Sequence, residues 1–160
     1  MANTTFNGPV RSENGFSDIT KNSTTGTITS TMTLQTYEAT ITVANGATTG
    51  KETAVGIPAN FIPMGVTVAV TTASTNAVNL NDIGTDADTD GYVDGISAAL
   101  NTTGFKGFFG CNGVLGMSGF TTGASGLVGD EVELVVSGDP GSDTVIVLKF
   151  FGISSTSDAS

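Results

Sequence analysis

Two stretches of this sequence alternate between apolar and polar side chains, and this alternation restricts the chain to a β-rich fold. Apolar residues occupy every second position of residues 37–43, and Val recurs at positions 66, 68 and 70. A period of two buries one face of a strand and leaves the other face in water. The residues between the valines are mostly Thr, whose branched side chain favours strands. Both stretches are therefore predicted strands.

Further strand and turn signals predict two packed sheets. Asn45-Gly46 marks a turn after the first strand. Residues 131–136 and 144–151 are predicted to form a hairpin around a turn at 137–143. The continuous apolar run 145–148 predicts a strand buried on both faces. No segment shows sustained helical periodicity. We therefore predict an all-β fold, an antiparallel two-sheet sandwich or jelly roll, with a β-barrel as the alternative.

The chain divides into three parts. Residues 36–153 hold the strands of the predicted sandwich domain, and residues 154–160 form a polar tail. Residues 1–35 contain few large apolar side chains, too few for a core, and are predicted to form an extended N-terminal arm. Such an arm gains order on a neighbouring protein, for example by adding a strand to a sheet edge; residues 28–34 have the alternation of a strand. The partner-binding side chains are predicted to be Phe6, Val10, Phe16 and Ile19, and a disordered tail is the alternative.

The composition indicates a surface of small polar side chains. Charged residues make up 12% of the chain, about half of the ~25% typical of soluble domains, and the net charge is −10. Thr, Ser, Asn and Gly must then cover much of the surface, and they lose little entropy when ordered. This suits a surface that another protein buries, although a secreted protein poor in lysine would look similar. Only five basic residues are present, and they are scattered, which argues against nucleic-acid binding.

The residue types needed for the common catalytic sites are missing. The chain has no His, so a Ser-His-Asp triad is excluded, and its single cysteine, Cys111, lacks the neighbouring base that a nucleophilic thiol uses. No phosphate-binding loop is present. Glu131 and Glu133 lie on one face of a predicted strand and are interpreted as its wet face, because like charges there need solvent. We expect that the protein is not an enzyme.

An acidic loop at residues 84–94 is the sharpest motif. Asp86, Asp88 and Asp90, followed by Gly91, match the first half of an EF-hand-like calcium loop, with the carbonyl of Tyr92 and the carboxylate of Asp94 as further ligands. Ser97 stands where the pattern needs a bidentate Glu, so another residue or subunit would have to complete the site. The alternative is a solvated acidic loop. We expect no cofactor other than this structural calcium ion.

The sequence also bears on location. No segment approaches the ~20 continuous apolar residues of a transmembrane helix. The first residues lack the basic stretch and apolar run of a secretory signal. We therefore expect synthesis in the host cytoplasm and no membrane partner.

Three stretches resemble the small virion structural proteins of marine tailed bacteriophages. They are the opening MANTTFNGPVRSENGF, the segment NDIGTDADTD at 81–90 and the closing VLKFFGI at 147–153. The resemblance implies a capsid decoration (cement) protein on the capsid exterior, bound to the major capsid protein. It also implies a homo-oligomer, often a trimer at local threefold axes. The alternatives are a subunit of a tail, fibre or extracellular filament, and a calcium-dependent binding module.

Overall fold

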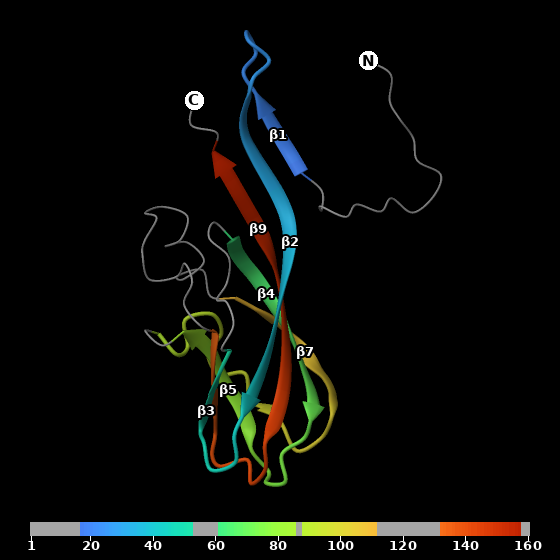
Figure 1. The fold of residues 1–160 in the computed structure, drawn as a ribbon, viewed down its shortest axis with the longest axis vertical. Coiled ribbons are helices and arrows are strands. Elements are labelled where there is room, and N and C mark those ends of the chain that lie inside the picture. Colours follow the sequence, from blue (N-terminus) through green and yellow to red (C-terminus); the bar gives the residue numbers. More distant parts are fainter. Residues whose placement is uncertain (1–16, 53–60, 86–87, 112–131, 158–160) are drawn as a thin grey trace, which may run out of the picture.

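The computed structural model describes residues 17–52, 61–85, 88–111 and 132–157, which form strands and no helix (Figure 1). The strands are β1 (Ser17–Lys21), β2 (Ile28–Val43), β3 (Thr49–Lys51), β4 (Phe61–Thr72), β5 (Asn79–Thr85), β6 (Ala98–Ala99), β7 (Gly104–Gly110), β8 (Val132–Val136) and β9 (Thr144–Ser157). The prediction of an all-β fold is confirmed.

The strands form two antiparallel sheets. One has the order β1-β2-β9-β4-β7 and the other the order β3-β8-β5-β6. The two sheets lie face to face in the lower part of the molecule in Figure 1, which confirms the predicted sandwich.

The core lies between the sheets and follows the alternation in the sequence. Val66 and Val68 of β4 are fully buried, as are Ile41 and Val43 of β2. The neighbouring strands add Ile146, Leu148 and Phe150 from the first sheet and Leu80, Ile83, Val132 and Leu134 from the second. The intervening residues of β2, such as Thr40, are exposed. The two sequence stretches with a period of two are therefore confirmed as half-buried strands.

The predicted hairpin between residues 131–136 and 144–151 is wrong. Both strands exist, but β8 pairs with β3 and β5, whereas β9 pairs with β2 and β4 in the other sheet. The connecting segment crosses between the layers. Asp139 fixes it there, because its Oδ1 accepts hydrogen bonds from Gly141 N (2.7 Å) and from Gly46 N (2.8 Å) in the turn after β2. These two bonds lower the pKa of Asp139.

The expectation that residues 145–148 are buried on both faces is also corrected. Ile146 and Leu148 point into the core and are fully buried, whereas Val145 and Val147 are only half-buried on the outer face of the first sheet. No strand of the second sheet covers that outer face, because the second sheet packs against the inner one.

Two strands continue past the sandwich. β2 crosses the expected domain boundary at residue 35, and β9 crosses the one at residue 153. Their pairing is continuous from Ser30–Ser157 to Val43–Thr144, so the body and the extension share one sheet. In Figure 1, β1 with the adjoining ends of β2 and β9 stands above the sandwich. We call β1, residues 28–35 and residues 152–157 the projecting ribbon.

Candidate functional site

The projecting ribbon is held together by its own hydrogen bonds. β1 pairs with β2 from Ser17–Thr33 to Lys21–Ile28. The turn between them closes on Asn22, whose Oδ1 accepts hydrogen bonds from Thr24 N (2.8 Å) and Thr25 N (3.1 Å). An Asn side chain that bonds its own turn in this way fixes the geometry of the hairpin. The ribbon therefore has a defined strand structure of its own.

The ribbon exposes apolar side chains on both faces. Ile19 is 45% exposed, Met32 46% and Leu34 43%. Met32 and Leu34 share one face, because they are two residues apart on β2, while Ile19 pairs with Thr31 and so lies on the opposite face. Of the predicted partner-binding side chains, Ile19 lies in β1, and Phe6, Val10 and Phe16 lie outside the described residues.

The acidic loop follows β5 and folds back onto it. Ile83 and Val93 exchange backbone hydrogen bonds of 2.9 Å, which close the loop at its base. Asp88 and Asp90 are exposed, and a side-chain hydrogen bond from Asp90 raises the pKa of Asp88, so these two carboxyl groups lie close together. Asp86 lies outside the described residues.

The other two residues of the predicted calcium loop differ in burial. Tyr92 is buried, and its ring packs edge-on against Phe150 with 5.6 Å between ring centroids, so its side chain belongs to the core. Asp94 is exposed. Within the described part of the chain, no three acidic side chains gather closely enough to hold a metal ion. The predicted calcium site includes Asp86, which lies outside the described residues, so the site stays a prediction.

A polar contact between a partly buried tyrosine and a buried glutamate joins the two sheets, and sequence reasoning missed it. The Tyr37 hydroxyl on β2 donates a 2.7 Å hydrogen bond to Glu52 Oε2, and Glu52, directly after β3, is buried. Burial raises the pKa of Tyr37, and the bond to Glu52 raises it further. This bond ties the first sheet to the second. Nothing in the local pattern reveals it, because the two residues meet only through packing.

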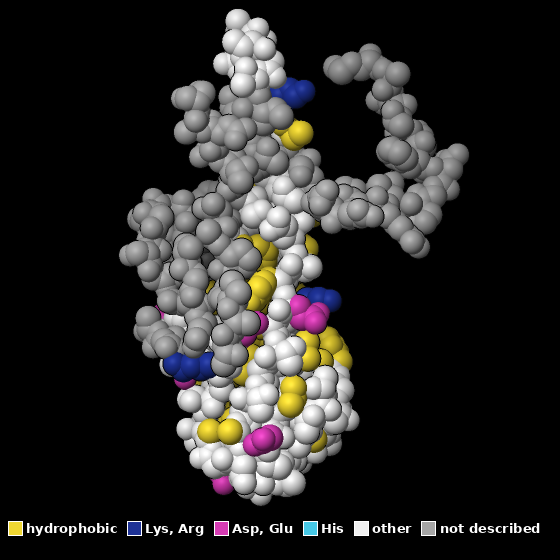
Figure 2. Space-filling view, in the orientation of Figure 1, with side chains coloured by type: hydrophobic (Ala, Val, Ile, Leu, Met, Phe, Trp, Pro, Cys, Tyr) yellow, Lys and Arg dark blue, Asp and Glu magenta, His cyan; other side chains and the backbone are white. Residues whose placement is uncertain are grey.

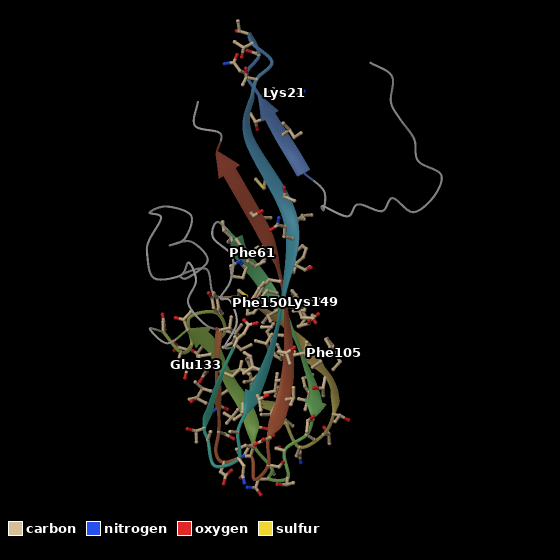
Figure 3. All side chains as sticks on the ribbon, in the orientation of Figure 1. Lys21, Phe61, Phe105, Glu133, Lys149 and Phe150 are labelled. Atoms are coloured by element: carbon tan, nitrogen blue, oxygen red, sulfur yellow. The ribbon has the colours of Figure 1, made fainter. Side chains whose placement is uncertain are left out.

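The interpretation of Glu133 as part of a wet face is wrong. Glu133 is 6% exposed, and its Oε2 lies 4.0 Å from Nζ of Lys51, its cross-strand partner on β3. Glu131 lies outside the described residues. Figure 3 shows Glu133 on the side of the second sheet. A charge on this strand can be buried because a lysine stands opposite it.

No protein-family model and no curated protein matches this chain. A solved structure, a chain of the cyanophage Pam1 capsid asymmetric unit, is similar to it. The identity is 18% and the TM-score 0.46, over 74% of this chain and 84% of that chain. A likeness of this size assigns neither a family nor a function.

Cys111 has the properties of a structural thiol. It follows β7, is partly buried and packs against the core. Burial raises its pKa to about 12, so the reactive thiolate is scarce at neutral pH. Separately, no helix within the described residues is long and apolar enough to span a membrane.

Proposed function

We propose that this chain is a non-enzymatic structural protein of a virion, a capsid decoration (cement) protein. It binds the outer surface of the major capsid protein lattice and stabilises the head. It acts as a homo-oligomer, for which the sequence resemblance implies a trimer.

The observation that carries the proposal is the projecting ribbon. A few strands outside a packed body gain little stability by themselves, and an exposed apolar edge invites association. Here Ile19, Met32 and Leu34 stay exposed on a hydrogen-bonded ribbon that the body presents at one end. An attachment element needs this combination of defined shape and uncovered apolar surface.

The composition and the sequence resemblance support the same function. Figure 2 shows few charged side chains on the described surface, and a surface rich in Thr, Ser, Asn and Gly costs little entropy to bury against a lattice. Repeated contacts around a symmetric assembly add up, so each one can be modest. The resemblance at residues 1–16, 81–90 and 147–153 points to virion proteins of tailed phages.

The test is binding of purified protein to heads that lack it, measured by co-sedimentation. Met32 and Leu34 together expose about 180 Å² of surface, if each side chain offers about 200 Å² in full. Replacing both with Ser removes about 100 Å² of this apolar surface, because the smaller Ser side chains keep the rest covered. We expect about 2–3 kcal/mol less binding energy per copy, or roughly 30- to 150-fold weaker binding.

The control is Met64→Ser, because Met64 is also an exposed methionine (53%) but lies in β4, which is not part of the ribbon. This control should bind like the original chain. Full binding by the ribbon variant would remove the ribbon as the attachment element. A chain that binds no heads and polymerises alone would indicate a filament subunit instead.

A further inference from the structure

The outer face of the first sheet carries an apolar surface that no described strand covers. Cross-strand register defines it in rows, since paired residues point to the same side of a sheet. One row joins Phe105 of β7 to Ala69 and Val147, and the next joins Phe108 to Thr67 and Lys149. Phe151 lies in the following row, opposite Gly65.

The aromatic rings on this face lie close together. A Cβ placed on Gly65 would meet the ring of Phe108, so that ring lies over Gly65, the direct partner of Phe151. Phe105 is 69% exposed, Phe108 59% and Phe151 38%. Figure 3 places Phe105 at the side of the body opposite to Glu133, away from the second sheet. We call Phe105, Phe108, Phe151, Ala69 and Val147 the outer apolar face.

The outer apolar face is large enough to form the centre of a protein interface. With about 200 Å² for a whole Phe side chain, the three rings alone expose about 330 Å². The largest apolar patch of a typical monomer is about 300–600 Å² and is often functional, and a standard interface buries about 800 Å² per partner. The half-buried Val147 fits this reading, because the apolar run of β9 is typical of a strand covered on both sides.

The charges on this face favour a second copy of the chain as its occupant. The chain as a whole carries a net charge of −10, so two copies repel each other over most of their surface. The three rows of the face carry one charge of each sign, Glu38 and Lys149, and these form an ion pair of 3.1 Å. A neutral apolar face is where two acidic copies can meet. The reversed Lys–Glu pair of a second copy also complements this one.

β7 is the edge strand of the first sheet among the described residues, and this edge is less suited to such a contact than the face. That edge carries a register irregularity next to Lys106, whose Nζ donates a 2.7 Å hydrogen bond to Thr102 Oγ1. A bulge and a lysine are the devices by which natural edge strands avoid pairing with another sheet.

We propose that the outer apolar face binds a second copy of this chain. The proposal deepens the proposed function, resting on its self-assembly, and names the surface that joins the subunits.

Sedimentation of the purified full chain at micromolar concentration tests the proposal. The original chain should sediment as an oligomer, and the double variant Phe105→Ser/Phe108→Ser should sediment at the monomer mass of 16.0 kDa. Raising the salt from about 0.05 to 0.5 M should strengthen the oligomer, since it screens the repulsion between acidic copies. Both replaced side chains are mostly exposed in the single chain, so the variant should stay folded. Its melting temperature should fall only by the stabilisation that oligomer formation gives the original chain.

Ile19→Ser is the matched control, because it removes an equally apolar, exposed side chain from the ribbon and should leave the oligomer intact. A monomeric original chain, or an oligomeric double variant, would overturn the proposal. Head binding is scored separately. An oligomer that does not bind heads contradicts the decoration function alone. A monomer that binds heads contradicts the homo-oligomer and its second-copy interface, but not the decoration function.

Discussion

Phe150 and Phe151 are consecutive residues of β9 that point to opposite faces of the first sheet, and replacing each with Ala tests that placement. Phe150 is fully buried between two other rings: its centroid lies 6.4 Å from that of Tyr37 and 5.6 Å from that of Tyr92. Phe151 is 38% exposed on the outer face. The sequence alone does not rank the two positions.

The expected losses in the free energy of unfolding differ by about 2–3 kcal/mol between the two variants. Replacing a fully buried Phe with Ala costs about 3–5 kcal/mol, since it removes about 200 Å² of buried apolar surface and leaves a cavity. The two aromatic contacts of Phe150 place its loss towards the upper end of that range. Phe151→Ala loses only part of that surface and leaves no enclosed cavity, so we expect about 1–2 kcal/mol.

Thermal and urea unfolding at low protein concentration measure both losses. For a chain of this size, 1 kcal/mol corresponds to about 2–4 °C in Tm, so Phe150→Ala should melt roughly 8–20 °C lower. Phe151→Ala should melt roughly 2–8 °C lower. A larger loss for Phe151→Ala than for Phe150→Ala would refute the register of β9, and with it the outer apolar face.

Three further predictions follow from single contacts. Gly152→Ala should lower the free energy of unfolding by about 1–3 kcal/mol, because the new Cβ would collide with the backbone carbonyl of Ile62, which cannot rotate away. An unchanged midpoint of urea unfolding would contradict this packing. Tyr37→Phe should cost about 1–3 kcal/mol at neutral pH, because it leaves the buried Glu52 without that hydrogen bond. The raised pKa of Tyr37 means that the folded state keeps a proton that the unfolded state loses above about pH 10. Stability should therefore fall as the pH rises past 10, less steeply in Tyr37→Phe, and equal slopes in alkaline titrations would refute this linkage. Millimolar calcium should raise the Tm of the chelated protein and Asp88→Ala should abolish that rise; no rise in the original chain would remove the calcium site.

The strands could be predicted from the sequence where one face is buried and the other is wet. Val66, Val68 and Val70 alternate with small or polar residues. The burial of β4 follows this pattern, because only one side of the sheet faces the core there. The turn at Asn45-Gly46 was equally readable, and Gly46 has the positive φ of 80° that the turn requires.

The pairing of the strands could not be predicted in the same way. Alternation assigns a strand to a half-buried sheet but does not say which sheet, so the sequence pattern of β8 and β9 predicts a hairpin that the structure does not contain. Which sheet each strand joins depends on contacts between residues distant in the sequence, such as the hydrogen bond from Gly46 to Asp139, 93 residues apart. The burial of Glu133 likewise depends on Lys51, a cross-strand neighbour distant in the sequence.

The acidic loop shows the same limit. The alternate carboxylates predict that Asp88 and Asp90 lie in one loop with their side chains close together, and the structure brings these side chains together. The position of the Tyr92 ring in the core could not be predicted, because its neighbours in the sequence are loop residues and its partner Phe150 comes from a distant strand.

The most direct test of the account is a difference map, from electron microscopy, between heads with and without this protein. The account predicts two-sheet bodies at regular positions on the outer capsid surface, touching one another, with the projecting ribbon directed at the major capsid protein. Density confined to the tail, or no difference between the two heads, would contradict it.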